Sequence, residues 1–150
     1  SMADKINFEI TTPEKKVFSD QVDEVILPTP NGEIGILPNH IPLVSLLSPG
    51  ELRIKKNEET VYLAVSGGFI EVRPDKVIVL ADTAEQAEEI DEAKAEEARQ
   101  RAQKMLSEKR ADATEFAALS AKIEKELARL KVVRRRRRRK ESSLPTRTKT

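Results

Sequence analysis

The chain has 150 residues, enough for one ordinary domain with an appendage, and its aromatic side chains are only one Tyr and four Phe. This low aromatic content excludes a large aromatic-lined pocket and a surface on which nucleic-acid bases stack. Cysteine is absent, which excludes disulfides and thiolate metal sites, and the apolar runs are too short to predict a transmembrane helix or a signal peptide.

The formal net charge of +1 conceals an uneven distribution along the chain. Residues 1–83 hold eight Lys or Arg against thirteen Asp or Glu, a net charge of −5, and residues 84–133 hold ten against twelve, a net charge of −2. Residues 134–150 hold nine against one, a net charge of +8. The chain therefore divides into an acidic first region, a nearly balanced second region and a basic end.

The first region, residues 2–83, has the pattern of short antiparallel strands. Apolar Ile6, Phe8 and Ile10 alternate with polar residues, and β-branched runs recur with turn signals between them. The other expected strands are residues 17–25, 24–27, 51–55, 61–65, 69–72 and 76–80. Because no helical pattern intervenes, the sequence predicts an antiparallel β-sandwich of two packed sheets.

Two stretches of this region are rich in glycine and proline: residues 31–44, NGEIGILPNHIPLV, and residues 65–74, VSGGFIEVRP. The glycines suit turns or bulges that a side chain would obstruct, and prolines end hydrogen-bonded runs on both sides of the only histidine, His40. These features specify backbone shape and contain no reactive group.

The second region, residues 84–133, predicts a helical hairpin, because glycine and proline are absent between Thr83 and Pro145 and alanine is frequent. A small-residue stripe and a large-residue stripe repeat at helical spacing, so two antiparallel helices can pack Leu and Ile over Ala. The break is expected at residues 110–114, with Asp112 or Thr114 as the N-cap. An Ala stripe buries little apolar area, so the hairpin is expected to open readily. The stripes are Ala95, Ala98, Ala102 and Met105, and Phe116, Leu119, Ile123, Leu127 and Leu130.

The third region, residues 134–150, begins with seven consecutive cations and ends in Ser, Pro and Thr. Mutual repulsion and the lack of apolar residues predict a disordered basic tail from residue 134 onward. Three roles remain open: a solvated tail, contact with an acidic surface of a partner subunit, or attraction to nucleic acid or anionic lipid.

Catalytic patterns are absent from the sequence, which has no cysteine, no histidine pair and no phosphate-binding glycine loop. His40 is interpreted as a loop histidine. The carboxylates that precede and begin the first helix are interpreted as acids that favour the positive end of a helix dipole. We therefore predict no catalytic residue and no metal site. These carboxylates are Glu85, Glu88, Glu89, Asp91 and Glu92.

In their order, their spacing and their distance from the Ala-rich half, the two glycine-rich stretches resemble the epsilon subunit of the bacterial rotary ATP synthase, over residues 4–133. The resemblance implies a non-catalytic subunit of the central stalk, peripheral to the cytoplasmic face of the bacterial plasma membrane. Its implied partners are the gamma subunit, the rotor-ring c subunits and, through the C-terminal helices, the catalytic alpha/beta head. Glu33 and His40 would contact the ring, and the helices would inhibit ATP hydrolysis when they extend.

Residues 90–95, IDEAKA, resemble the nucleotide-binding motif of ATP-binding members of this family. Ile90, Asp91 and Ala95 match the motif, whereas Lys94 replaces an arginine. The remaining implied contacts are Glu85, Arg101, Lys125 and Arg129, with Lys125 again in place of an arginine. The resemblance therefore implies no required cofactor and ATP as a weak regulatory ligand.

An alternative class is an adaptor for nucleic acid or an anionic membrane, in which the arginine-rich tail is the active part. The run lacks interleaved aromatic residues and glycines, so no specific nucleic acid is expected as a partner. Co-purification separates the two classes, since a stalk subunit should bring down gamma and the catalytic head, and an adaptor should bring down nucleic acid or lipid.

Overall fold

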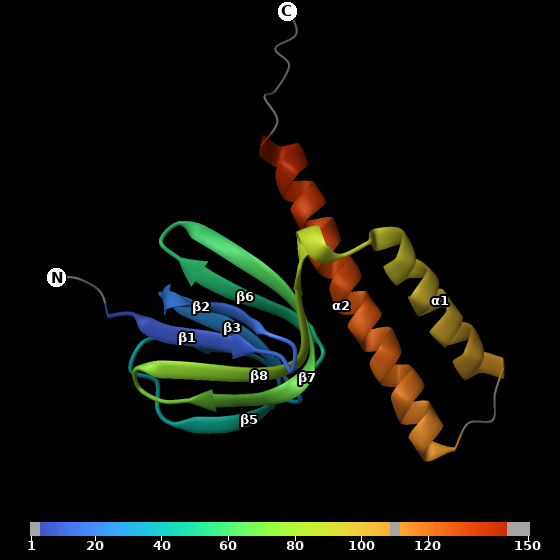
Figure 1. The fold of residues 1–150 in the computed structure, drawn as a ribbon, viewed down its shortest axis with the longest axis horizontal. Helices are drawn as coiled ribbons and strands as arrows, with labels where there is room; N and C mark the ends of the chain where they lie inside the picture. Colours follow the sequence, from blue (N-terminus) through green and yellow to red (C-terminus); the bar gives the residue numbers. More distant parts are fainter. Residues whose placement is uncertain (1–3, 109–111, 144–150) are drawn as a thin grey trace, which may run out of the picture.

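The computed structural model describes residues 4–108 and 112–143, which form a β-domain followed by two helices that lie side by side (Figure 1). None of the described helices is long and apolar enough to cross a membrane. The strands are β1 (Ile6–Thr11), β2 (Lys16–Val22), β3 (Glu24–Thr29), β4 (Gly32–Ile36), β5 (Leu43–Leu47), β6 (Gly50–Lys56), β7 (Glu59–Val72) and β8 (Lys76–Gln86). The helical elements are the 3-10 turn η1 (Ala87–Glu89), α1 (Glu92–Glu108) and α2 (Ala113–Ser143).

The two layers of the β-domain are parts of one hydrogen-bonded sheet that folds over on itself. The first half of β7 pairs with β6 in the layer that also holds β3 and β4, and its second half pairs with β5 in the other layer. Gly67 and Gly68 lie between the halves, with φ of +55° and +134°. A Cβ at Gly68 would lie 1.9 Å from the carbonyl oxygen of Leu80, so only glycine fits. The expected turn is therefore a bend within one continuous strand.

One strand pair departs from the expected antiparallel arrangement. β1 runs parallel to β8, with Asn7 beside Lys76 and Thr11 beside Leu80, whereas the other described pairs are antiparallel. A hairpin turn joins neighbouring strands and forces them antiparallel, but β1 and β8 stand at opposite ends of the domain sequence. Their relative direction is therefore free of that constraint.

The core lies between the layers and contains the alternating residues of the first strand, as predicted. Ile6, Phe8 and Ile10 are at most 1% exposed, and Phe8 packs with its ring centroid 5.9 Å from that of Phe18. The buried members of this core run from Ile6 to Ala84 and include no residue of α1 or α2. The β-domain therefore closes its hydrophobic core without the helices.

The boundary between the domains lies slightly later than the expected division at residues 83 and 84. Thr83 pairs with Ser66 and Gln86 with Leu63, so β8 continues to Gln86 before η1 begins. The hairpin break is where the sequence predicts it, because Asp112 Oδ1 accepts a hydrogen bond of 2.8 Å from the backbone N–H of Glu115. Asp112 is thus the N-cap of α2.

The expected disorder from residue 134 is wrong for residues 134–143, which continue α2 as a helix. Residues 144–150 lie outside the described part of the chain. Arginine is a good helix former, and extending an existing helix is far easier than starting one. Nearby carboxylates also neutralise much of the repulsion between the cations.

The large-residue stripe of the hairpin is buried only in part. Ala95 and Ala102 are buried as expected, but Phe116 is 55% exposed and Leu127 is 47% exposed. The difference arises because α2 contacts α1 and also the outer face of the sandwich, so its buried face is shared between two neighbours. The buried residues of α2 are Glu126, Ala128, Leu130 and Val132.

Candidate interaction surfaces and the helix–sandwich junction

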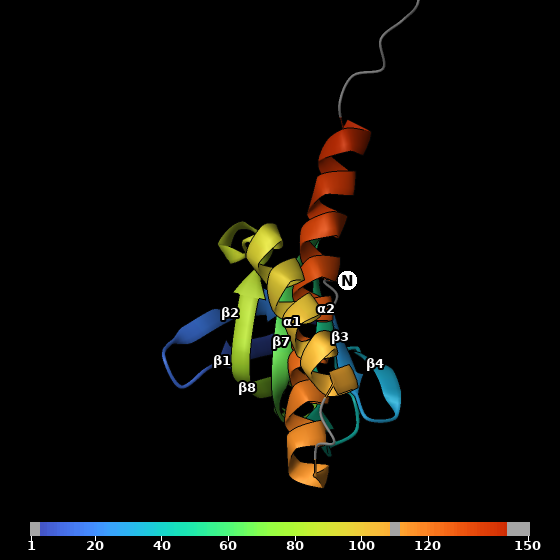
Figure 2. The same ribbon diagram turned by 90° about the vertical axis from the view of Figure 1, so that its right-hand side faces the viewer.

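The outer face of one sandwich layer is covered by the C-terminal half of α2 (Figure 2). Glu51 pairs with Ala64 and Arg53 with Tyr62 across β6 and β7, which places these side chains together under the helix. Ala64, with Tyr62 beside it, joins a second apolar cluster whose other buried members are Ile90, Ala95, Ala128, Leu130 and Val132. Ion pairs accompany this apolar cluster where the helix contacts the sandwich.

Glu51 and Arg135 form the central polar contact of the junction. The guanidinium of Arg135 donates two hydrogen bonds of 2.7 Å to the Glu51 carboxylate, whose side chain is 1% exposed. Arg53 also lies 3.3 Å from Glu51 and 3.1 Å from Glu33, and Tyr62 places its ring 4.6 Å below the Arg135 guanidinium. Hydrogen bonding to Glu51 raises the pKa of Arg135 above its ordinary value. Alternating charges therefore link β4, β6 and α2.

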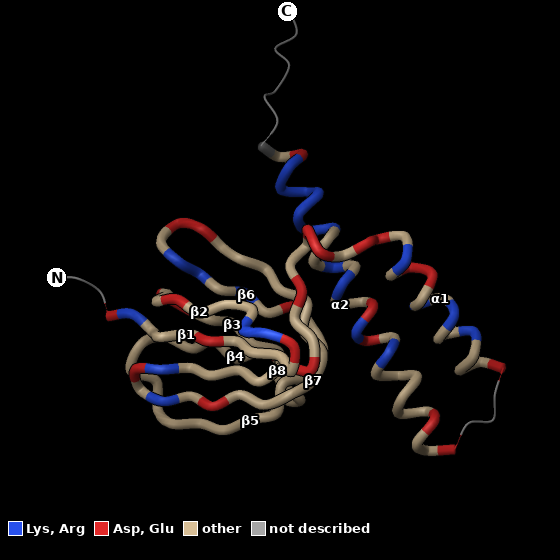
Figure 3. The backbone as a smooth tube through the Cα atoms, in the orientation of Figure 1, with Lys and Arg blue, Asp and Glu red and all other residues tan. Residues whose placement is uncertain are grey.

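Three further arginines of the run contact carboxylates at the start of the helical region. Figure 3 shows this basic end of α2 beside acidic segments of the chain. Arg134 and Arg137 lie 3.4 Å and 3.0 Å from Glu92, and Arg136 lies 3.3 Å from Glu88. Such exposed pairs are each worth only about 0–1 kcal/mol. The buried Glu51 pair is therefore the contact whose loss should matter most.

A second polar network lies deeper along α2. Arg129 donates hydrogen bonds of 2.7 Å to Glu85 and 2.9 Å to Glu126, whose side chain is completely buried. Lys122 lies 3.1 Å from the other oxygen of Glu126, outside hydrogen-bond geometry. Burial alone would lower the pKa of Arg129, but Glu126 and Glu85 outweigh it and raise that pKa. Arg129 thus ties β8 to α2 in the folded hairpin.

The residues expected to bind a nucleotide are distributed around this junction. Glu85 and Arg129 meet as an ion pair, and Asp91 caps α1 by accepting a 3.1 Å hydrogen bond from the backbone N–H of Lys94. Ile90 and Ala95 are buried in the second apolar cluster. Lys94 and Arg101 are exposed on α1, and Lys125 is half-buried on α2. The motif IDEAKA therefore has a structural role as a helix start in this conformation.

The residues expected to contact the rotor ring lie along one edge of the sandwich. Glu33 is on β4, the edge strand of its layer, and its side chain is 50% exposed. His40 is partly exposed in the loop after β4, with Nδ1 2.7 Å from the carbonyl oxygen of Ile41. About four residues of strand, roughly 13 Å, separate Glu33 from the start of this loop. The loop also exposes Leu37 and Ile41 to 57% and 75%.

An exposed apolar row on the other layer was not anticipated from the sequence. Leu46, Phe69 and Leu80 are directly opposite one another on β5, β7 and β8, and each is more than half exposed. Val44, two residues from Leu46 on β5, is 74% exposed. The sequence contains a signal for this row. Residues 43–47, LVSLL, and residues 76–80, KVIVL, have apolar side chains on both faces of their strands. A strand with one face in water instead alternates apolar and polar residues.

A sandwich with one outer face covered by its own helix and an apolar row left uncovered on the other belongs to the class of small binding subunits. The family model of the ATP synthase delta/epsilon chain beta-sandwich domain matches residues 5–87, and the model of its long alpha-helix domain matches residues 88–134. The chain belongs to the ATP synthase delta/epsilon family, as the sequence resemblance implied. It is an epsilon-type chain, a non-catalytic subunit with a β-sandwich followed by two helices.

The relatives support the match over nearly the whole chain. The ATP synthase epsilon chain of Dehalococcoides mccartyi (strain CBDB1) is 47% identical over 133 residues, 89% of this chain and 95% of that one. The epsilon chain of Syntrophobacter fumaroxidans is 48% identical over 131 residues, 87% of this chain and 97% of that one. In fold, the chain is similar to a chain of the Euglena gracilis mitochondrial ATP synthase, with a TM-score of 0.71 and 24% identity, covering 83% of this chain and 78% of that one.

Proposed function

We propose that the chain is a rotor component that joins the gamma subunit to the c subunits in the central stalk of a bacterial ATP synthase. It would lie peripherally at the cytoplasmic face of the plasma membrane. The observation that carries this proposal is the match of both halves, in the family order, to epsilon chains over nearly their full length. The Tetrahymena thermophila structure that resembles this fold, with a TM-score of 0.59, is of a mitochondrial central stalk and c-ring.

Gamma is the proposed occupant of the apolar row formed by Leu46, Phe69 and Leu80. The opposite layer is contacted by α2, whereas this face leaves a row of apolar side chains exposed for a permanent partner. Permanent subunit interfaces are more apolar than ordinary surface, and aromatic residues contribute most to their stability. Phe69, in the middle of the row, is the expected centre of the contact.

The c subunits are the proposed partners of the β4 edge and the loop that follows it. Glu33 presents a carboxylate there, and His40 lies between the exposed apolar side chains of Leu37 and Ile41. An edge strand with a neighbouring apolar loop suits contact with the polar loops of a ring, because it combines apolar burial with charge pairing. On binding, the Glu33 carboxylate would form an ion pair with a cation of the ring and weaken its present ion pair with Arg53.

Phe69→Glu should weaken binding of gamma by at least about tenfold, because it places a charge at the centre of an apolar contact. Phe116→Glu is the matched control, since Phe116 has nearly the same exposure but lies on α2. The measurement is co-purification and titration of gamma with each full-length variant. Equal binding by both variants would remove gamma from this face.

Regulation of ATP hydrolysis is the proposed role of the helices, which also supply the contact with the alpha/beta head. In the described conformation α2 is held on the sandwich by the Glu51–Arg135 pair and the Glu85–Arg129 pair. Release of these pairs would let the helices extend toward the head and oppose rotation in the direction of hydrolysis. A two-state element of this kind needs only a few kcal/mol between its states.

ATP is proposed as a weak ligand of the folded hairpin, and Lys94→Arg should strengthen its binding roughly five- to thirtyfold. An arginine fork holds two phosphate oxygens, whereas the ammonium of Lys94 is a point charge on a flexible stem. Calorimetric titration of the wild type and Lys94→Arg measures the difference, with Lys104→Arg as a control, because it makes the same substitution at an exposed position on the same helix outside the motif. Absence of binding by both proteins would leave IDEAKA with its helix-capping role alone.

The adaptor alternative required a free cationic tail. Within residues 134–143, Arg134 to Arg137 each contact a carboxylate of the chain itself, which leaves less charge for nucleic acid or lipid. No observation therefore favours this alternative over a stalk subunit.

A further inference from the structure

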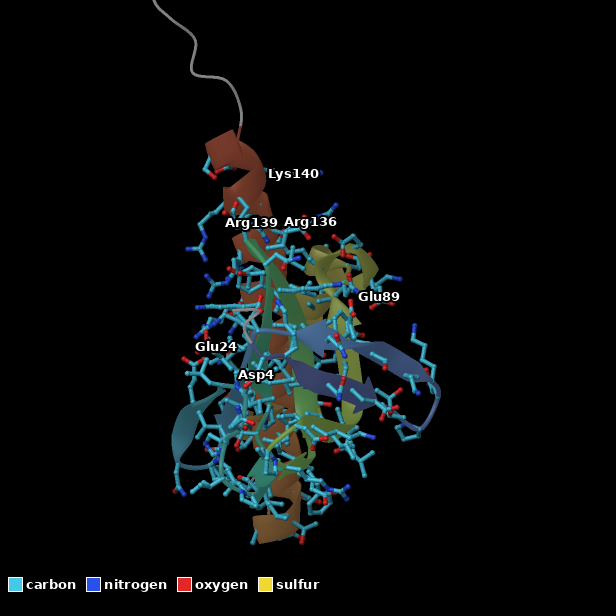
Figure 4. The ribbon with its side chains drawn as sticks, turned by 90° about the vertical axis from the view of Figure 1, so that its left-hand side faces the viewer. Asp4, Glu24, Glu89, Arg136, Arg139 and Lys140 are labelled. Atoms are coloured by element: carbon cyan, nitrogen blue, oxygen red, sulfur yellow. The ribbon has the colours of Figure 1, made fainter. Side chains whose placement is uncertain are left out.

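A cleft of about 160 Å³ opens where α2 meets β7 and η1. Its walls include Tyr62 and Thr60 from β7, Glu88 from η1, and Arg136 and Arg139 from α2. A neighbouring hollow adds Lys140 and Ser142 from the next turn of α2. Figure 4 shows Arg136 and Arg139 together near the end of α2, with Lys140 beyond them. The cleft is therefore built from both domains.

Positive charge exceeds negative charge around this cleft. Among the residues that line the cleft itself, Arg136 and Arg139 are cations and Glu88 is the one acid. In the preceding turn of α2, the charge of Arg135 is balanced by the buried carboxylate of Glu51. Arg139 instead donates a 3.2 Å hydrogen bond to the carbonyl oxygen of Thr60 and lies 5.4 Å from the centre of the Tyr62 ring. These are neutral partners, so its charge is not balanced by a carboxylate among the described residues.

We propose that this cleft binds a phosphate-type anion: inorganic phosphate, pyrophosphate or the phosphoryl end of a nucleotide. Guanidinium groups bind phosphate oxygens in pairs through their fork of N–H donors, and Arg136 and Arg139 bring two such forks to one opening. Arg136 also lies 3.3 Å from the exposed carboxylate of Glu88, so a bound anion would replace that exposed ion pair. The Gln86 side chain adds an amide to the lining. None of these residues belongs to the set proposed above for ATP, so the two sites are independent.

Binding in this cleft would also stabilise the folded hairpin. β7 and η1 form one wall and α2 forms the other, so the complete site exists only while α2 lies on the sandwich. A ligand that binds one of two states shifts the equilibrium by the factor 1 + [L]/Kd, which is about elevenfold at ten times Kd. The effect on ATP hydrolysis rests on the proposed function, but the binding is a property of the isolated chain.

The test is a calorimetric titration of the full-length chain with phosphate, pyrophosphate and ADP at constant ionic strength, accompanied by phosphorus NMR. Arg139→Gln should weaken pyrophosphate binding about tenfold, as expected for loss of one charge-assisted contact. Arg136→Gln should weaken it by a similar factor. Arg138→Gln is the matched control, because Arg138 is exposed on the same turn and lines neither hollow. The control should bind as the wild type does, within about twofold.

The ligands and the control distinguish the outcomes. Tighter binding of ADP than of pyrophosphate, weakened by Arg139→Gln, identifies a nucleotide phosphoryl group in this cleft, whereas equal or weaker binding of ADP identifies a free anion. ADP binding that Arg139→Gln leaves unchanged belongs to another site and does not support the cleft. An equal loss in Arg138→Gln and Arg139→Gln would show unspecific attraction to the cationic helix and reject the site, as would no binding by the wild type. Helix content measured by circular dichroism checks that each variant retains α2, and these measurements do not depend on an assembled ATP synthase.

Discussion

Arg135→Met should release the C-terminal half of α2 from the sandwich, with a cost to docking of about 2–3 kcal/mol, or roughly a 30- to 150-fold shift toward the undocked state. The substitution leaves the Glu51 carboxylate, whose side chain is 1% exposed, with Arg53 at 3.3 Å as its one remaining cationic partner among the described residues. Glu51→Gln should cost less, because the freed Arg135 side chain is 28% exposed and can turn toward water.

The measurement is the distance between probes attached to Glu58→Cys and Glu141→Cys, which is simple here because the chain has no cysteine of its own. Arg138→Met is the control, since it removes an arginine from the same turn with no contact to the sandwich among the described residues. Undocking by the control to the same extent would assign the effect to total helix charge. Undocking by salt should be partial, because screening acts on the exposed Glu88 and Glu92 pairs more than on the buried one.

The fragment of residues 2–86 should fold by itself and bind gamma as the full chain does. Its core runs from Ile6 to Ala84 without a helix residue, and the row centred on Phe69 is retained. In an assembled enzyme the same truncation should raise ATP hydrolysis while proton coupling persists, since the proposed inhibitory element is gone and the proposed link between gamma and ring remains.

Circular dichroism, thermal unfolding and gamma titration of the fragment check the first part, and hydrolysis and proton pumping in membranes check the second. A fragment that does not fold would mean that α2 is required to complete the sandwich. A folded fragment that binds gamma but leaves hydrolysis unchanged would remove inhibition from the functions of the helices.

Local patterns in the sequence were sufficient for the family and for most of the elements, although β4 and β5 were not among the expected strands and the end of α2 was expected to be disordered. The alternation of Ile6, Phe8 and Ile10 identifies a strand and its buried face, because successive side chains on a strand point to opposite sides. Asp112 identifies a helix start, because a carboxylate satisfies the free N–H groups there. The glycine-rich stretches carry the family resemblance. The backbone at Gly68 has a φ of +134° that other residues rarely adopt, so a glycine at such a position marks a feature of the fold.

Contacts between distant segments were decided by the tertiary structure alone. Arg135 lies 84 residues from Glu51 in the sequence, and no local pattern pairs them. Seen in isolation, residues 134–140 are a repelling cation run. In the fold they extend α2 as a helix, and carboxylates from β6, η1 and α1 offset their repulsion. The parallel pairing of β1 with β8 likewise joins segments that are far apart in the sequence, so no local pattern predicts it. Side-chain periodicity identifies which face of a segment is buried, whereas the partner of that face depends on how the whole chain closes.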